Sequence, residues 1–343
     1  MANLARNPEQ PSYQALEDRE GRKGANEQSE PDSLYMRLVD EVGCRDFNKT
    51  NFKTCDVSSL DLPIPGTTSL ERVKLSDGSE ASYRVHIPKD YDANKPLPVV
   101  LMFHGYGRTP SQGGAERGAA GMEEVTGLSQ LADSEGFIAV YPEGNPERSY
   151  SWNNGQWFFS GRDDKEMTNK ILDTVQEKLA VDKDRIYIVG YSQGGSFTHN
   201  IANKLSERVA AVVENAGWMT GKEDLPKRPF PILSIQSRTD DTVPYDGNPW
   251  YSITMKPESY TQDFYRRANG IAGEPEVATR VGLDNTKIEE YTWRNSQTGN
   301  QVKTMVLNGQ GHLWYGGKGA EGTAIDTTRE AWNFLKQFRR VER

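Results

Sequence analysis

The segment from Ile186 to Gly195 constrains the fold of this chain more than any other. It reads Ile-Tyr-Ile-Val-Gly-Tyr-Ser-Gln-Gly-Gly, an apolar run that ends in the pattern Gly-x-Ser-x-Gly. A sharp turn from a strand into a helix presses the first glycine of this pattern against the last, so neither position has room for a side chain. Such a turn would lift the hydroxyl of Ser192 clear of the sheet and aim the N–H of Gln193 at the same point. The segment therefore predicts a strand, a tight turn with an accessible serine, and a helix.

The residues on both sides of this pattern agree with that prediction. Residues 185–189 alternate and concentrate β-branched and aromatic residues, as a buried parallel strand does. Phe197, Ile201 and Leu205 recur every four residues and mark one face of a helix. The alternative is a glycine-rich turn with an ordinary surface serine, and the order of strand, turn and helix argues against it.

A reactive serine needs a base, and the chain has four histidines. His199 lies within the helix after Ser192, so we expect a surface or packing residue. His86 lies inside a strand-like segment and is expected to be partly buried there. His104 ends an apolar run and is expected to shape the loop that follows. His312 lies in a glycine-flanked loop near the C-terminus and is the predicted base.

The third residue must be a carboxylate that orients the histidine, and the order Ser…Asp…His places it between the other two. Asp240 and Asp241 follow the short apolar segment 231–235. Successive residues of a loop point in different directions, so only one of them can face the imidazole. The spacing to Val243-Pro-Tyr245 favours Asp240, and the other aspartate is then a turn-stabilising or solvated carboxylate.

These segments resemble the poly(3-hydroxybutyrate) depolymerase, feruloyl esterase and acetylxylan esterase group of α/β-hydrolases, which is carbohydrate esterase family one and its relatives. The matching pieces span roughly residues 68–340 in the family's order. They are His104–Gly107, Tyr141–Gly144, Ser151–Asn153, Gly190–Gly195, Asp240–Tyr245 and Gly311–Trp314. The chain has Gln236-Ser237 where the family often has His-Gly, and Trp314-Tyr-Gly316 where it often has Trp-Pro-Gly. These departures bear on the substrate and leave the three predicted catalytic positions intact.

The resemblance implies acyl transfer to water. Ser192 would attack an ester carbonyl, His312 would carry the proton, and Asp240 would fix the imidazole. The N–H groups of Gln193 and Tyr106 would form the oxyanion hole. We expect no cofactor and no metal, because the few histidines and cysteines are scattered and no glycine-rich phosphate loop is present.

Strand-like and helical segments alternate along the chain, which predicts an α/β fold. We expect the α/β-hydrolase fold, with a mostly parallel eight-stranded sheet, helices on both faces and no large lid. Two helices are marked by residues 167–179 and 332–338. The strand-like segments are residues 69–75, 81–87, 98–104, 137–141, 186–191, 209–214, 231–235, 287–294 and 301–307.

The N-terminal part of the chain reads differently. Residues 1–33 are polar and are interpreted as a flexible leader. Residues 34–67 form an expected N-terminal extension with a short helix over 34–42, and the catalytic domain covers 68–343. Cys44 and Cys55 lie in this extension on either side of the sequon at Asn48, and a disulfide between them would favour secretion. Two unrelated free thiols are the alternative.

Charge and hydropathy bear on location and partners. The formal net charge of −8 argues against nucleic acid or an anionic membrane as a partner. No apolar run is long enough to span a membrane. No signal peptide is visible in the sequence. Because a disulfide would favour secretion, we expect a secreted protein whose signal peptide is absent from this sequence, and a cytoplasmic location is the alternative. The oligomeric state is left open.

The substrate is inferred from aromatic residues near the predicted loops, since their rings stack on sugars or on a hydroxycinnamoyl group. They are Tyr106, Trp152, Trp157, Phe158, Phe159, Trp218, Tyr245 and Trp314. Trp152, Trp314, His104 and Tyr245 are the predicted substrate-binding residues. The leading hypothesis is a serine esterase acting on plant cell-wall feruloyl or acetyl esters. The alternatives are a polyhydroxyalkanoate or polyester depolymerase or oligomer hydrolase, and a non-catalytic carbohydrate-binding protein that keeps only the fold.

Overall fold

The computed structural model describes residues 64–107, 118–156, 159–248 and 253–340. The chain divides into two units, Met1–Leu62 and Pro63–Arg343, and every described residue belongs to the second. The predicted leader, the extension up to residue 63 with its helix, and the cysteine pair Cys44 and Cys55 therefore lie outside the described residues.

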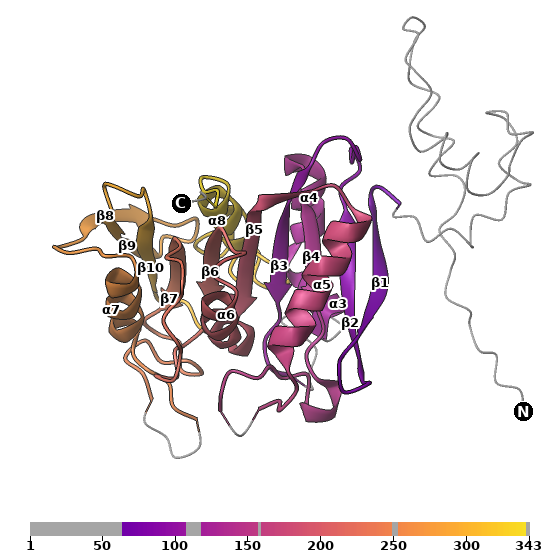
Figure 1. The fold of residues 1–343 in the computed structure, drawn as a ribbon. Helices are drawn as coiled ribbons and strands as arrows, with labels where there is room; N and C mark the ends of the chain where they lie inside the picture. Colours follow the sequence, from indigo (N-terminus) through magenta and orange to yellow (C-terminus); the bar gives the residue numbers. More distant parts are fainter. Residues whose placement is uncertain (1–63, 108–117, 157–158, 249–252, 341–343) are drawn as a thin grey trace, which may run out of the picture. The chain divides into compact units, whose positions relative to one another are not determined.

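One sheet runs through the described part of the chain (Figure 1), with the strand order β1-β2-β4-β3-β5-β6-β7-β10-β9-β8. Its strands are β1 (Thr67–Lys74), β2 (Glu80–Ile87), β3 (Leu97–Phe103), β4 (Ile138–Pro142), β5 (Val181–Tyr191), β6 (Ala211–Asn215), β7 (Ile232–Ser237), β8 (Glu276–Val281), β9 (Lys287–Arg294) and β10 (Gln301–Asn308). The six strands from β4 to β10 in this order pair in parallel, and the two at either end pair antiparallel. The carboxyl ends of the parallel strands share one edge, which brings the loops after them together.

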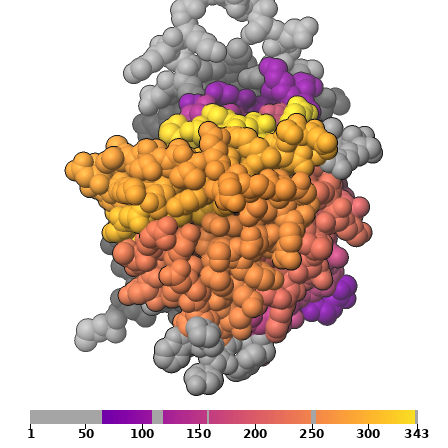
Figure 2. All heavy atoms as spheres, turned by 90° about the vertical axis from the view of Figure 1, so that its left-hand side faces the viewer, coloured from indigo at the N-terminus to yellow at the C-terminus, as the bar shows by residue number. Residues whose placement is uncertain are grey.

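The sheet has ten strands where eight were expected. All nine strand-like segments named from the sequence overlap strands, so nine of them join the sheet rather than eight, and β8 is the tenth strand. Its side chains lie almost entirely in solvent, with Val277 58% and Val281 65% exposed, so its sequence lacks the alternation that a half-buried strand shows. β8 and β9 form a hairpin between α7 and β10 that widens this end of the sheet, where the segment from α7 to β9 forms most of the visible surface (Figure 2).

Helices cover both faces of the sheet, as expected from the alternating segments. α5 (Asp164–Lys178), α6 (Gln193–Lys204) and α7 (Glu258–Ala268) lie on one face. α3 (Gly118–Thr126), α4 (Leu128–Glu135) and α8 (Thr327–Leu335) lie on the other, and a short 3-10 helix, η3 (Pro146–Arg148), follows β4. Among the described residues, no helix combines the length and the apolar character needed to cross a lipid bilayer.

The central strands divide their side chains between two cores. In β3, Val99, Leu101 and Phe103 pack toward α5 and α6, and the residues between them pack toward α3 and α8. Both sets are fully buried, which explains the continuous apolar run in the sequence. The sheet is thus fixed from both sides at the strands that lead into the loops of the carboxyl edge.

Candidate active site

Ser192 lies on the turn between β5 and α6, with φ 56° and ψ −121°. This backbone conformation is strained for a residue with a side chain and costs about 1–3 kcal/mol. The glycines at either end allow the turn to close. A Cβ at position 190 would lie 2.4 Å from the carbonyl oxygen of Gly194, and one at position 194 would lie 2.3 Å from that of Phe103. The turn thus has the geometry that the Gly-x-Ser-x-Gly pattern predicts.

Regular main-chain bonds hold this turn. The N–H of Ser192 donates to the carbonyl of Asn215 at the end of β6, over 2.9 Å. The carbonyl of Ser192 accepts from the N–H of Ser196, also at 2.9 Å, as the first bond of α6. The serine hydroxyl is therefore presented at the positive end of a helix, where a developing negative charge is favoured.

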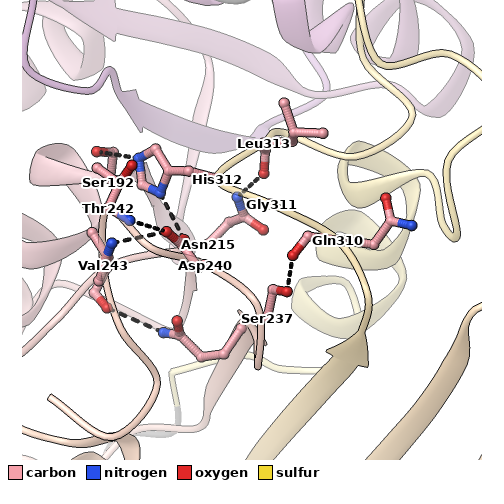
Figure 3. Close-up of polar contacts among 12 residues, drawn as sticks. Ser192, Asn215, Ser237, Asp240, Thr242, Val243, Gln310, Gly311, His312 and Leu313 are labelled. Carbon is pink, nitrogen blue, oxygen red and sulfur yellow. Dashed lines mark hydrogen bonds and ion pairs between the residues drawn. The ribbon is translucent and has the colours of Figure 1, made fainter.

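Three predicted residues form a continuous hydrogen-bonded chain (Figure 3). His312 Nε2 lies 2.8 Å from Ser192 Oγ, and its Nδ1 lies 2.7 Å from Asp240 Oδ2. Because a carboxylate only accepts, Nδ1–H donates to Asp240, which leaves Nε2 to accept the serine proton. The imidazole is thus oriented to remove a proton from the hydroxyl.

Of the two adjacent aspartates, the structure brings Asp240 to the imidazole and leaves Asp241 exposed. Asp240 is 3% exposed, and its other carboxylate oxygen accepts from the N–H groups of Thr242 and Val243 at 2.9 and 2.8 Å. These two bonds fix the orientation of the carboxylate. They come from the turn after β7, which explains why the first aspartate of the pair faces inward.

The predicted oxyanion donors lie on two segments next to the serine. Gln193 is the first residue of α6, and its side chain bonds to the main chain of Trp152, accepting from the main-chain N–H at 3.0 Å and donating to the carbonyl at 2.8 Å. Only its main-chain N–H is therefore available to a substrate. Tyr106 lies on the loop after β3, where a Cβ on Gly105 would lie 3.2 Å from the serine Cβ. The loop thus passes directly beside Ser192.

The His104 ring holds the start of this loop through hydrogen bonds to the main chain. Its Nδ1 lies 2.7 Å from the carbonyl of Gly105, and its Nε2 accepts from the N–H of Gly144 at 2.9 Å. This pattern assigns the proton to Nδ1. An oxygen of Glu143 lies 3.2 Å from the same Nε2 and would bond to it only if the ring were doubly protonated. His104 is 3% exposed and its ring nitrogens are engaged by the main chain, and a contact between His104 and substrate stays a prediction.

Trp152 and Trp314 were expected to line the substrate pocket, and both are buried. Trp152 is 0% exposed, stacks on Phe197 with ring centroids 5.2 Å apart, and donates from Nε1 to the carbonyl of His104 at 2.7 Å. Trp314 is 1% exposed and donates from Nε1 to Thr328 at 2.9 Å. Both indoles satisfy their N–H inside the protein and are packed in the interior, and their role in substrate binding stays a prediction.

Tyr245 is partly buried on the loop after β7. The guanidinium of Arg238 lies over its ring at 4.7 Å from the centroid, a cation–π contact. Burial raises the pKa of its phenol. A role for Tyr245 in substrate binding stays a prediction.

The two remaining histidines are packing residues. His199 is 0% exposed in α6 with its Nδ1 3.2 Å from the hydroxyl of Tyr265, so a surface position is ruled out. Burial lowers the pKa of its imidazole to about 3. His86 is buried in β2, with its ring nitrogens 3.0 Å from Thr68 Oγ1 and 3.1 Å from Asp133 Oδ1. Neither histidine is oriented toward the serine.

An apolar cluster at the carboxyl edge was not singled out from the sequence. Phe159, Trp218 and Val243 are buried together, with Tyr106 edge-on to Phe159 at 5.9 Å. Among the described residues, the buried Trp218 Nε1 and Gln156 Nε2 lack hydrogen-bond partners. Phe159 and Trp218 were among the aromatics noted in the sequence. Sequence position alone does not distinguish the residues of this cluster from the buried indoles of Trp152 and Trp314.

A second feature that was not predicted from the sequence is the pair of buried carboxyl groups of Glu214 and Glu258. Glu214 in β6 is 0% exposed and accepts from Gln236 at 2.8 Å, from Ser234, and from the N–H of Gly217 at 2.8 Å. Burial raises its pKa to about 7. Burial, and then the charge of Glu214, raise the pKa of Glu258, which accepts from Thr304 at 2.9 Å. Glu214 thereby fixes the main chain at Gly217, two residues after Asn215.

No group of three or more His, Cys, Asp or Glu side chains in the described ranges is arranged to hold a metal ion.

Comparison with known proteins places the chain in a family. Residues 76–322 match the Esterase family, described as "Putative esterase". Similar curated proteins include a bifunctional acetylxylan esterase/xylanase from Neocallimastix patriciarum, 24% identical over 266 residues and 77% of this chain. Feruloyl esterase B from Piromyces equi is 27% identical over 265 residues and 74% of this chain. The chain spans only 34% and 44% of the length of these two relatives.

Solved structures agree on the fold. An acetyl xylan esterase from Aspergillus awamori superposes with a TM-score of 0.55 at 14% identity, covering 78% of this chain and 99% of that chain. A thermostable esterase gives a TM-score of 0.51 at 19% identity, covering 80% and 63%. These similarities show the α/β-hydrolase fold. Because the family match covers most of its length, the chain belongs to the Esterase family.

Proposed function

We propose that the protein is a serine carboxylic ester hydrolase that acts through an acyl-enzyme on plant cell-wall feruloyl or acetyl esters. The observation that carries this proposal is the hydrogen-bonded chain from Ser192 through His312 to Asp240, with links of 2.8 and 2.7 Å. A hydroxyl, an imidazole and a buried carboxylate in this order are the groups that nucleophilic acyl transfer requires.

In the first half of the reaction, Ser192 Oγ attacks the ester carbonyl while His312 Nε2 accepts its proton. Asp240 stabilises the imidazolium that forms and remains ionised itself. The imidazolium then gives its proton to the leaving alcohol, and the acyl group stays on the serine. In the second half, His312 removes a proton from water, the resulting hydroxide attacks the acyl-enzyme, and the serine is released with its proton.

The main-chain N–H groups of Gln193 and Tyr106 form the proposed oxyanion hole. The side chain of Gln193 is occupied by Trp152, and the His104 ring bonds to the carbonyl of Gly105. In a trans peptide the C=O and N–H point in opposite directions, so a carbonyl directed toward His104 turns the next N–H away from that ring. Losing one such donor typically reduces the rate by about 10²–10³.

The exposed residue Tyr106, which packs against the buried cluster of Phe159, Trp218 and Val243, favours a flat aromatic acyl group as one substrate. Tyr106 is 47% exposed on the loop beside the serine, so its ring is the part of this aromatic group that a substrate could contact. Aromatic walls with a few polar groups are typical of small-molecule sites. The names of the similar feruloyl and acetylxylan esterases support the same substrate class.

Secretion is part of the proposal. Its support is the pair Cys44 and Cys55 with the sequon at Asn48, all outside the described residues. Protein recovered from culture medium should migrate differently in gel electrophoresis with and without reductant. Such a difference would support a disulfide between the two cysteines.

Purified protein assayed against methyl ferulate, acetylated xylan, a hydroxybutyrate trimer and 4-nitrophenyl acetate tests the activity and the substrate together. We expect turnover of methyl ferulate or acetylated xylan well above that of the trimer. The variant Ser192→Ala should lose at least about 10⁴-fold in kcat while its melting temperature is kept. Full activity in that variant would refute the mechanism, and preference for the trimer would refute the substrate class.

A further inference from the structure

The loop that carries His312 has no regular secondary structure, yet its main chain is bonded at four successive residues. Each carbonyl from residue 310 to residue 313 accepts from a side chain. The donors are Ser237 and Thr239 to residue 310, Tyr315 to residue 311, Tyr191 to residue 312 and Asn215 to residue 313. Four of these five donors lie on β5, β6, β7 and the turn after β7. The position of the imidazole is therefore set by side chains of the neighbouring strands.

Two of these donors also contact the serine side of the site. Tyr191 directly precedes Ser192, and its hydroxyl donates to the carbonyl of His312 at 3.1 Å. Its ring stacks on the imidazole, with centroids 5.3 Å apart and planes 27° apart. Asn215 accepts the N–H of Ser192 on its main chain and donates from its side chain to the carbonyl of Leu313 at 2.9 Å (Figure 3). Each residue thus spans the gap between nucleophile and base.

The chemistry of both donors suits this task. Asn215 is 0% exposed, so its amide does not exchange partners with bulk water. Burial, and then the charge of Asp240, raise the pKa of the Tyr191 phenol, which keeps its hydroxyl protonated and able to donate. A buried donor with one carbonyl partner fixes that carbonyl strongly, because losing the bond leaves a polar group unsatisfied.

We propose that Asn215 and Tyr191 are positioning residues that set the separation of Ser192 Oγ and His312 Nε2. They act through the carbonyls of Leu313 and His312 and take no part in bond making. The proposal rests on the proposed function, because it concerns the same serine and histidine. A displacement of about 1 Å between reacting groups can reduce a rate by about 10².

The test compares Asn215→Asp and Tyr191→Phe with the control Asn203→Asp. An aspartate at position 215 would place an acceptor against the Leu313 carbonyl, and a phenylalanine at 191 keeps the ring but removes the donor. Asn203 is likewise buried, accepts from the Tyr265 hydroxyl at 3.3 Å, and lies about 16 Å further along α6. With 4-nitrophenyl acetate we expect kcat to fall about 10–100-fold in Asn215→Asp, about 3–10-fold in Tyr191→Phe, and less than about 3-fold in the control, with KM nearly unchanged in all three.

Two further measurements separate positioning from general destabilisation. The rate of Ser192 labelling by a fluorophosphonate should fall in parallel with kcat. The downfield proton resonance of His312 Nδ1–H should shift or broaden in both test variants and not in the control. If Asn215→Asp does not fold, Tyr191→Phe alone decides, since it removes one oxygen atom.

Test variants that fold and match the control in kcat and labelling rate would overturn the proposal. A wild-type protein that neither hydrolyses 4-nitrophenyl acetate nor reacts with the fluorophosphonate would instead refute the proposed function. The two failures are therefore distinguishable.

Discussion

The nucleophile and the base of this site are held in different ways. Ser192 is fixed by local structure: a strand, a helix, their main-chain bonds and two glycines that let the turn close. His312 lies in a loop whose position depends on side-chain donors, four of them 71 to 121 residues away in the sequence. The first arrangement stores strain in a few adjacent residues, and the second distributes its bonds over the ends of three strands and the turn after the last of them. The difference determines which substitutions each side tolerates.

The largest expected effect concerns the carboxylate on the base side. Asp240→Asn should reduce kcat about 10⁴-fold, because an amide can hold the imidazole in the wrong tautomer. Asp241→Asn should change kcat less than about 3-fold, since that side chain is exposed. Steady-state kinetics with 4-nitrophenyl acetate gives both values. Equal losses in the two variants would contradict the assignment of Asp240.

A matched pair of glycine substitutions contrasts the two sides directly. A Cβ at Gly190 would lie 2.2 Å from Thr198 Oγ1 and 2.4 Å from a carbonyl, whereas one at Gly311 would meet no atom within 4 Å. We expect Gly190→Ala to lower the free energy of unfolding by about 1–3 kcal/mol or more, and Gly311→Ala to change it by less than about 0.5 kcal/mol. Urea denaturation measures both. A tolerated alanine at 190 would show that the turn can relax.

The last contrast is a pH dependence of stability on the nucleophile side, which leaves the catalytic groups themselves unchanged. Glu214 bonds the N–H of Gly217, and a Cβ on Gly217 would lie 2.6 Å from Gly195 of the serine turn. Burial raises the pKa of Glu214 from 4.5 to about 7. Between these two pH values, the carboxyl group is therefore protonated in the folded state and ionised in the unfolded state. This contribution to stability is complete below about pH 4.5 and is lost as the pH rises through 7.

The variant Glu214→Gln tests that dependence. Its unfolding free energy should rise relative to wild type between about pH 4.5 and 7 and level off above, measured by denaturation at a series of pH values. Glu177→Gln, an exposed substitution on α5, is the control and should show no such trend. A difference that is flat with pH would mean that Glu214 titrates normally in the folded protein.

The same contrast explains how far the sequence could be interpreted. The turn at Ser192 can close because positions 190 and 194 are glycines, so a short pattern predicts it although its N–H also bonds to Asn215. Alternating apolar runs likewise predict the central strands, since both of their faces are buried. β8 was not predicted, because an exposed edge strand carries no such pattern.

The burial of the predicted substrate-binding residues could not be predicted from sequence patterns, because their environment is set by distant segments. Trp152 and Trp314 lie next to catalytic segments in the chain, yet their N–H groups find partners inside the protein. The donors Tyr191 and Asn215 could not be recognised either, because their acceptors are main-chain carbonyls, which every residue has. Chain order and loop character pointed to His312, and its catalytic role stays a prediction.

The bonded carbonyls of residues 310–313 also bear on how such a catalyst could be rebuilt. Transplanting residues 308–317 into a related scaffold would transfer the histidine without its external supports. A working graft would need matching hydroxyl and amide groups at the ends of three adjacent strands and in the turn after the last. Recombination between distant members of such a family should therefore succeed only when those strand ends and the loop are exchanged as one block.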